Sequence, residues 1–234
     1  MTIDEFILEL KKINITLNQN QIKQLEKYYE MVINYNKVMN LTGITEKKEF
    51  YLKHFYDSLT LNKIISLNNI NTLCDIGSGA GFPGIVLKIA FPNLKITLVD
   101  SLNKRINFLN KVIEELQLQE ITTIHQRAEI FAKNNIENFD LVTARAVAKL
   151  NILLEISIPM LKINGNFIAM KSNINDEVKN INSLENILNC KVIDIQEFLL
   201  PIENSKRTLV KIEKLNKTSI IYPRKFEQIK KKPL

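Results

Sequence analysis

A glycine-rich turn contains the residues of this chain that are best placed to do chemistry. An apolar run over residues 70–76 is followed by Gly77, Gly79 and Gly81, and an apolar helical pattern begins at Ile85. Glycine has no Cβ and accepts positive φ, so the backbone of such a turn can approach a ligand closely. The helix that follows would direct free N–H groups at the same ligand. The pattern therefore predicts a ligand-binding strand–turn–helix unit.

Two acids indicate which ligand the turn holds. Residues 79–84 match the G-x-G-x-x-G pattern of dinucleotide-binding proteins, which is weak evidence by itself. Asp75, two residues before the first glycine, would repel a pyrophosphate and attract an ammonium group. Asp100 ends the next apolar run, where a carboxylate can accept hydrogen bonds from both ribose hydroxyls. S-adenosylmethionine fits both acids, because it has an amino-acid end and a ribose but no phosphate; a nicotinamide dinucleotide is the alternative.

Both acids also have a purely structural explanation. Asp75 at a strand end could bind local backbone N–H groups, and Asp100 could cap the helix predicted at 103–118. These local roles stay open beside the cofactor prediction.

Strand and helix patterns alternate around the turn. Strands are predicted at 70–76, 95–100, 121–126, 139–144 and 164–171, and helices at 84–91, 103–118, 129–135 and 148–161. This alternation predicts a parallel sheet with helices on both faces. A polar helix at about 174–188 precedes strands at 190–199 and 207–213, whose spacing predicts a hairpin. We therefore expect the sheet to end in an antiparallel pair.

The first third of the chain has no strand pattern. A capping box, Thr2 to Glu5, begins a short helix, and further helices are predicted at about 18–39, ending before Asn40, and at about 46–66. We expect an N-terminal helical cap over 1–68 in front of a sheet domain over 69–234, together forming one compact unit.

Composition excludes several classes of protein. There is no run of eighteen apolar residues, so no membrane span is predicted, and the first residues lack the features of a signal peptide. Cys74 and Cys190 lie far apart and the chain has only two histidines, so we expect no metal site. We expect both cysteines to be reduced and buried in a cytoplasmic protein.

The positive charge is concentrated at the C-terminal end. The formal net charge is +7, and ten basic residues against two acids give residues 205–234 a charge of +8. A nearly neutral body with a basic edge predicts a polyanionic partner, although a solvated lysine tail has the same composition.

Several segments resemble one family of enzymes. The longest are DIGSGAGFPG (75–84), LVDSLNKR (98–105) and FDLVTARA (139–146), with shorter matches at 39–42, 54–59, 168–171, 222–225 and 232–234. They are similar, in the same order, to motifs of the bacterial ribosomal RNA small-subunit methyltransferase G family, also called GidB. The resemblance covers nearly the whole chain.

The resemblance implies a fold and an activity. The fold is α/β, the class I S-adenosylmethionine-dependent methyltransferase (Rossmann-like) fold, with a seven-stranded, mostly parallel, doubly wound sheet behind the helical cap. The activity is transfer of a methyl group from S-adenosylmethionine to guanine N7 in the 530 loop of 16S rRNA (position 527 in that RNA's numbering). The partner would be 16S rRNA, in the small ribosomal subunit or an assembly intermediate, and nothing requires more than a monomer. A methyltransferase acting on a small molecule or protein is the alternative.

The residue pattern and the resemblance together assign roles to single residues. Cofactor binding is predicted for Asp75, Gly77, Gly79, Phe82, Asp100, Ser101, Ala128, Glu129 and Arg145. Substrate positioning at the catalytic centre is predicted for Arg145, Lys171 and Asn40. Contacts to the RNA backbone are predicted for Arg224, Lys225, Lys230, Lys231 and Lys232.

The proposed chemistry needs no general base. Guanine N7 is an acceptor with an in-plane lone pair and carries no proton, so the protein's task is mainly positioning. The sequence after the fourth strand, ARAVAK (144–149), agrees with this, because it contains neither the N/D-P-P-Y/F motif used for exocyclic amino groups nor a cysteine nucleophile.

Several of these residues also have structural alternatives. Asn40 could only end a helix in the left-handed conformation, and Glu129 could be a first-turn acid. Arg145 could make a surface ion pair, and His54 and Asp57, three residues apart on a helix, could bond each other.

Overall fold

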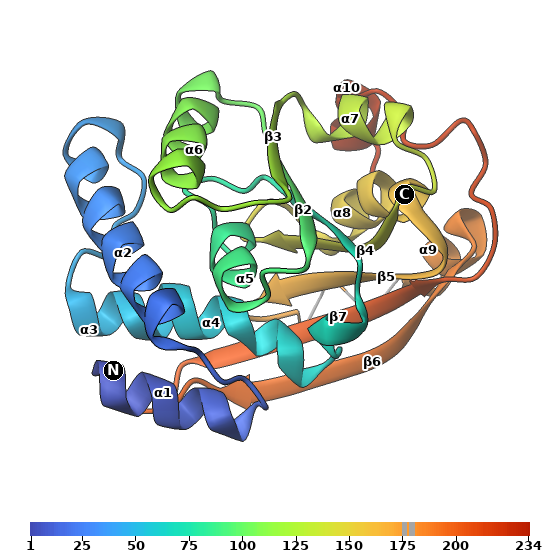
Figure 1. Cartoon of the computed structure of the whole chain (residues 1–234). Coiled ribbons are helices and arrows are strands. Elements are labelled where there is room, and N and C mark those ends of the chain that lie inside the picture. The colour runs from blue at the N-terminus through green and yellow to red at the C-terminus, as the bar shows by residue number, and fades with distance from the viewer. Residues whose placement is uncertain (175–176, 178–180) are drawn as a thin grey trace.

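A single seven-stranded sheet forms the centre of the protein in the computed structural model, which describes residues 1–174, 177 and 181–234. The strands are β1 (Thr72–Ile76), β2 (Lys95–Asp100), β3 (Ile121–His125), β4 (Phe139–Arg145), β5 (Leu161–Lys171), β6 (Cys190–Leu199) and β7 (Lys206–Lys214). Their order is β3-β2-β1-β4-β5-β7-β6, and β7 runs antiparallel to both β5 and β6 (Figure 1). The predicted mostly parallel sheet that ends in an antiparallel pair is confirmed.

Helices cover both faces of this sheet. Those that follow β1 are α5 (Gly84–Ala90), α6 (Asn103–Glu115), α7 (Ala128–Asn134), α8 (Leu150–Ser157), α9 (Ile181–Leu188) and α10 (Phe226–Lys231). Figure 1 shows α5 and α6 on one side and α7 to α10 on the other, and each side has its own hydrophobic cluster. The helix predicted from 174 lies partly outside the described residues, and α9 forms its second half.

Two further sequence expectations concern burial and membrane spans. Cys74 and Cys190 are buried free thiols, as predicted. Among the described residues, no helix has the length and apolar character that crossing a membrane would need.

The N-terminal helices are α1 (Ile3–Lys12), α2 (Gln19–Met39), α3 (Lys47–Phe50) and α4 (Asp57–Leu59). The capping box of Thr2 and Glu5 is present, and Asn40 ends α2 with φ 50° and ψ 56°. The single helix predicted over 46–66 is instead interrupted: residues 51–56 form a π-helical segment and 60–63 a 3₁₀ turn. Sequence periodicity misses this, because a six-residue segment is little more than one turn and is too short to show a period of its own.

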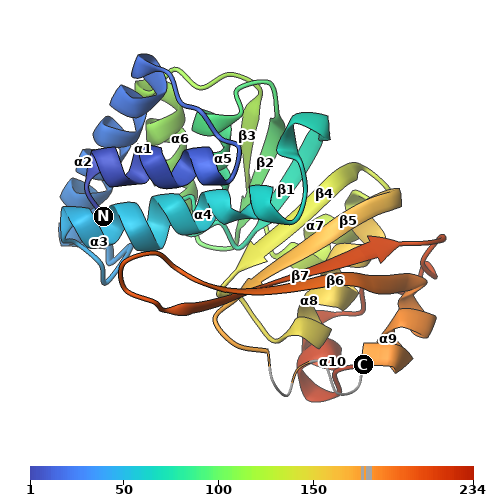
Figure 2. The ribbon, with the colours of Figure 1, turned by 90° about the horizontal axis from the view of Figure 1, so that it is seen from below.

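The helical cap packs directly onto the glycine turn. Tyr28 on α2 is fully buried, and its hydroxyl donates a hydrogen bond to the Ala80 carbonyl at 2.6 Å. Its ring lies 5.8 Å from that of Phe55 and 5.5 Å from that of Phe82, measured between centroids. Figure 2 shows α1, α2 and α4 on the same side as α5 and α6. We propose that cap and sheet unfold as one unit, because they share one hydrophobic cluster.

Replacing Phe6 by alanine tests this proposal. Phe6 on α1 is 1 % exposed and packs edge-on against Tyr51, so we expect Phe6→Ala to cost about 3–5 kcal/mol of unfolding free energy. Denaturant unfolding should keep a single transition at a lower midpoint. Leu8→Ala is the matched control, because Leu8 is on the same helix but 58 % exposed. A separate early transition confined to the helices would contradict the proposal.

Candidate active site

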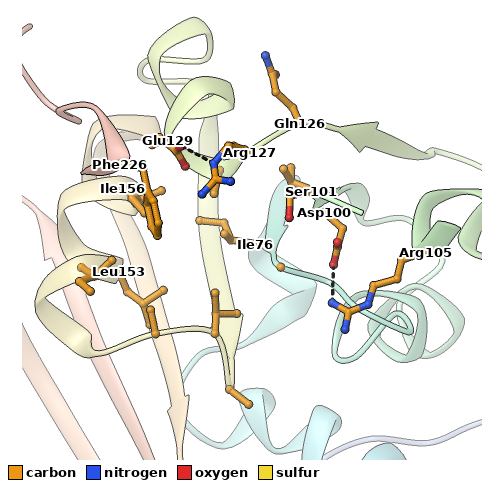
Figure 3. A pocket seen from close by; sticks show the side chains of 17 residues that line it. Ile76, Asp100, Ser101, Arg105, Gln126, Arg127, Glu129, Leu153, Ile156 and Phe226 are labelled. Atoms are coloured by element: carbon orange, nitrogen blue, oxygen red, sulfur yellow. Dashed lines mark hydrogen bonds and ion pairs between the residues drawn. The ribbon is translucent and has the colours of Figure 1, made fainter. Parts of the chain in front are cut away.

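A cavity of about 320 Å³ lies at the carboxyl ends of β1, β2 and β4. Five of the predicted cofactor-binding residues line it, namely Gly77, Asp100, Ser101, Ala128 and Glu129 (Figure 3). The position is the expected one for a ligand of an open α/β sheet, because strand order reverses at β1, between β2 and β4. Asp75, Gly79, Phe82 and Arg145 do not line this cavity.

Asp100 combines a local role with a place in the cavity wall. Its Oδ1 accepts a hydrogen bond from the Leu102 N–H, and its Oδ2 accepts one from the Gly79 N–H, both at 2.9 Å. Arg105 pairs with the same Oδ2 at 3.4 Å. A carboxylate has about four acceptor positions, so Asp100 can still accept a hydrogen bond from a ligand hydroxyl. Gly79 does not line the cavity, but its hydrogen bond to Asp100 connects the glycine turn to the end of β2.

Asp75 lies beneath the turn. It is fully buried, and its Oδ2 accepts a hydrogen bond from the Gly84 N–H at 2.9 Å, which secures the first turn of α5. Its Oδ1 has no hydrogen-bond partner among the described residues. Burial raises the pKa of Asp75 to about 7. The local role left open by the sequence is therefore present, and the contact with a ligand ammonium group stays a prediction.

The glycine turn has the backbone that only glycine adopts easily. Gly77, Gly79 and Gly81 have φ of 66°, 60° and 105°. A Cβ on Gly77 would lie 2.7 Å from a methyl carbon of Val147, in the loop that follows β4. The loop after β4 therefore packs against the glycine turn at Gly77, where both segments line the cavity.

Lys171 holds the loop after β4 in place. Its Nζ donates a hydrogen bond to the Ala148 carbonyl at 2.6 Å and pairs with Glu177 at 2.8 Å. The side chain is only 12 % exposed, so Lys171 is not a solvated lysine at a strand end. Any effect of Lys171 on a substrate would pass through this loop.

Arg145, at the end of β4, belongs to a second group of residues outside the cavity. Its guanidinium donates to Nδ1 of His54 at 3.2 Å and to Asp57 Oδ2 at 3.4 Å. Arg207 on β7 donates to the other oxygen of Asp57 at 3.1 Å. The ring of Phe82 lies 5.2 Å from the Arg145 guanidinium. We call Thr42, His54, Asp57, Phe82, Arg145 and Arg207 the arginine cluster.

His54 is a titratable member of the arginine cluster that stays neutral at pH 7. Burial, and secondarily the charge of Arg145, lower the pKa of His54 to about 3. Since Nδ1 accepts from Arg145, the ring proton is on Nε2, which donates to Thr42 Oγ1 at 2.7 Å. The ring also stacks on Phe82 with centroids 4.3 Å apart. Asn40 lies two residues before Thr42 and has the left-handed conformation of a helix end.

The five predicted RNA-binding residues divide into two kinds. Arg224 makes a bidentate ion pair with Glu155, at 2.8 Å and 2.6 Å, and Glu155 is fully buried. The remaining four are exposed and lie on or beside α10: Lys225, Lys230, Lys231 and Lys232. Arg224 therefore anchors the C-terminal segment, whereas the lysines face solvent.

Sequence reasoning missed several residues of the cavity wall. Arg105, Arg127, Val147 and Phe226 line it as well. Arg105 lies within a segment already singled out by the resemblance, whereas no local pattern marks Phe226, which is distant in sequence from every other lining residue.

These residues fit S-adenosylmethionine. The turn allows close approach at Gly77, Asp100 keeps acceptor capacity for a ribose, and the cavity is large enough for part of a nucleoside. Among the residues that the structure describes, none donates a hydrogen bond to Oδ1 of buried Asp75, which is therefore an acceptor available to a ligand donor.

Comparison with known proteins points in the same direction. A family profile described as rRNA small subunit methyltransferase G matches residues 21–210. Ribosomal RNA small subunit methyltransferase G of Bacillus subtilis (strain 168) is 46 % identical over 237 residues, covering 100 % of this chain and 99 % of that protein. The protein of the same name from Bacillus pumilus (strain SAFR-032) is 46 % identical with the same coverage.

Solved structures support the fold alone. Precorrin-6y C5,15-methyltransferase from Geobacter metallireducens GS-15 superposes with a TM-score of 0.51 at 16 % identity, covering 76 % of this chain and 92 % of that one. A structure described as StiE O-MT residues 961–1257 gives 0.58 at 15 % identity, covering 79 % and 82 %. The predicted class I methyltransferase fold is confirmed.

Gly77→Val should disrupt cofactor binding. The left-handed φ and the contact with Val147 both oppose a side chain there, so we expect roughly tenfold or greater loss of S-adenosylmethionine affinity in calorimetry. Gly43→Ala is the control, because a Cβ at Gly43 meets nothing within 4 Å. Unchanged affinity of Gly77→Val would refute the role of the turn.

His54 should make stability depend on pH. Its folded-state pKa of about 3 is below the ordinary value of 6.5, so the unfolded chain takes up a proton first as the pH falls. The stabilisation is complete above pH 6.5 and is lost as the pH falls towards 3, at up to about 1.4 kcal/mol per pH unit. Asp75 contributes in the opposite sense over this window, because its raised pKa of about 7 makes the folded chain bind that proton first. The measurement is therefore the difference between slopes: in denaturant unfolding at pH 7 to 4, the unfolding free energy of His54→Gln minus that of wild type should grow as the pH falls, whereas His125→Gln should keep the wild-type slope. Equal slopes for wild type and His54→Gln would contradict the assignment.

Proposed function

Because the chain belongs to the rRNA small subunit methyltransferase G family, we propose that it methylates N7 of a guanosine in the 530 loop of 16S rRNA (position 527 in that RNA's numbering), using S-adenosylmethionine. The observation that carries the proposal is a cavity lined by Gly77, Asp100 and Glu129 in a chain that matches its relatives from end to end.

The cofactor's contribution is an electrophilic methyl group on a sulfonium. Asp100 and Ser101 would hold the ribose, Ala128 and Glu129 the adenine, and Gly77 would allow the amino-acid end to approach the backbone. This assignment is supported by the shared cavity wall of these five residues.

The protein's task at the base is positioning, since N7 already presents its lone pair. Arg145 is a suitable group, because Asp57 and His54 fix its guanidinium at the end of β4. Lys171 would act through the Ala148 loop, and Asn40 through the chain that leads to Thr42. None of these steps needs a proton acceptor, which agrees with a neutral His54 whose two ring nitrogens are both engaged.

The RNA backbone would be held by the exposed lysines Lys225, Lys230, Lys231 and Lys232. Their separation from a nearly neutral body supports a sequence-independent phosphate contact that weakens with salt. In this proposal a monomer acts in the cytoplasm on 16S rRNA, within the small subunit or an assembly intermediate.

A labelled-methyl assay tests the proposed function. The protein is incubated with methyl-labelled S-adenosylmethionine and small ribosomal subunits from cells that lack the modification, and the RNA is then digested to nucleosides. We expect label in 7-methylguanosine within the 530 loop. Arg145→Ala should lower the transfer rate by about tenfold or more while S-adenosylmethionine affinity stays within about twofold, because Arg145 lies outside the cavity wall. Label in another nucleoside, or transfer without RNA, would overturn the proposal.

A further inference from the structure

The C-terminal segment, residues 222–234, is anchored and does not trail into solvent. Besides the Arg224–Glu155 ion pair, Ile229 on α10 is fully buried in the cluster that contains Leu153 and Ile156 of α8. In Figure 1 α10 overlaps α7, and the two helices meet where Arg127, just before α7, contacts the ring of Phe226 at the start of α10. We call this segment the C-terminal strap. Its anchors give the side chains near them a defined position.

The C-terminal strap places one aromatic ring in the cavity wall. Phe226 is the first residue of α10 and lines the cavity together with Leu153 and Ile156. The guanidinium of Arg127 lies 4.7 Å from the centre of the Phe226 ring and pairs with Glu129 at 3.0 Å. In Figure 3 Phe226, Ile156 and Glu129 lie at one end of the cavity, and Asp100 and Arg105 at the other.

The chemistry of the Phe226 end suits a flat base with a polar edge. Phe226, Leu153 and Ile156 offer apolar surface, while the Glu129 carboxylate can accept a hydrogen bond from an exocyclic amino group. A ribose bound at Asp100, at the opposite end, would leave the base to occupy this part of the cavity. Stacking of a base on an aromatic side chain is sequence-tolerant and strong enough to matter for affinity.

We propose that Phe226 is a cofactor-binding residue, contributed by the C-terminal strap, whose ring packs against the adenine base of S-adenosylmethionine. The proposal rests on the cofactor of the proposed function but not on its RNA target. It gives the C-terminal strap a role that its charge alone does not indicate, because the same segment that exposes four lysines also closes the adenine end of the cavity.

Calorimetry without RNA tests the proposal. We expect Phe226→Ala to bind S-adenosylmethionine about tenfold more weakly than wild type, and Phe226→Tyr to stay within about twofold. The same ratio is expected for methylthioadenosine, which keeps the base and ribose but lacks the amino-acid end. Equal affinity of wild type and Phe226→Ala would overturn the proposal, as would a loss seen with S-adenosylmethionine but not with methylthioadenosine.

Matched variants separate the ring from the rest of the strap. Glu227→Gln, at an exposed position of the same helix, should keep wild-type cofactor affinity. Phe226→Leu retains apolar volume without a π-face and should be intermediate, and it replaces the alanine variant if thermal unfolding shows that Phe226→Ala is not folded. If wild type itself did not bind S-adenosylmethionine, the proposed function would fail together with this inference; binding by wild type with no effect at Phe226 would overturn the inference alone.

Discussion

Two carboxylates hold the glycine turn in place. The cavity and the arginine cluster both depend on this turn, because Gly77 lines the cavity and Phe82 belongs to the cluster. Asp75 binds the Gly84 N–H from beneath, and Asp100 binds the Gly79 N–H from β2. A Cβ at Gly84 would come within 2.8 Å of the Asp75 carboxylate, so the close approach requires glycine there. Burial opposes ionisation of Asp75, and one of its oxygens has no hydrogen-bond partner in the described part of the chain, so the turn is held at an energetic cost. Such local cost is common where a backbone is shaped for a ligand.

The glycine turn contacts the cavity on one side and the helical cap on the other, so the cap is connected to the candidate site. On one side Gly77 forms part of the cavity; on the other, Ala80 receives the Tyr28 hydroxyl and Phe82 stacks on His54. The cap thereby brings residues from the first quarter of the chain beside Arg145 at the end of β4. If the reaction is the proposed N7 methylation, which depends on positioning rather than proton transfer, such a connection between the cavity and the arginine cluster would help to align the base with the methyl group.

Basic residues at the C-terminal end have different tasks despite their similar chemistry. Arg224 neutralises the fully buried Glu155, because an unpaired charge there would be strongly destabilising. That pair fixes the C-terminal strap, which in turn presents Phe226 to the cavity and exposed lysines to solvent. Charge counting treats all five residues alike, whereas burial and partner distinguish anchor from surface.

Features that depend on neighbouring residues could be predicted from the amino-acid sequence. The alternation of strands and helices, the capping box of Thr2 and Glu5, the antiparallel end of the sheet and the glycine turn with its two acids all follow from local spacing, and the family resemblance is confirmed. The folded structure was needed to show that Lys171 holds a loop, that Arg145 joins His54 and Asp57 and that Phe226 reaches the cavity. The physical reason is distance along the chain: these contacts join residues far apart in sequence, and burial, which sets the ionisation of Asp75 and His54, exists only once the whole chain has packed.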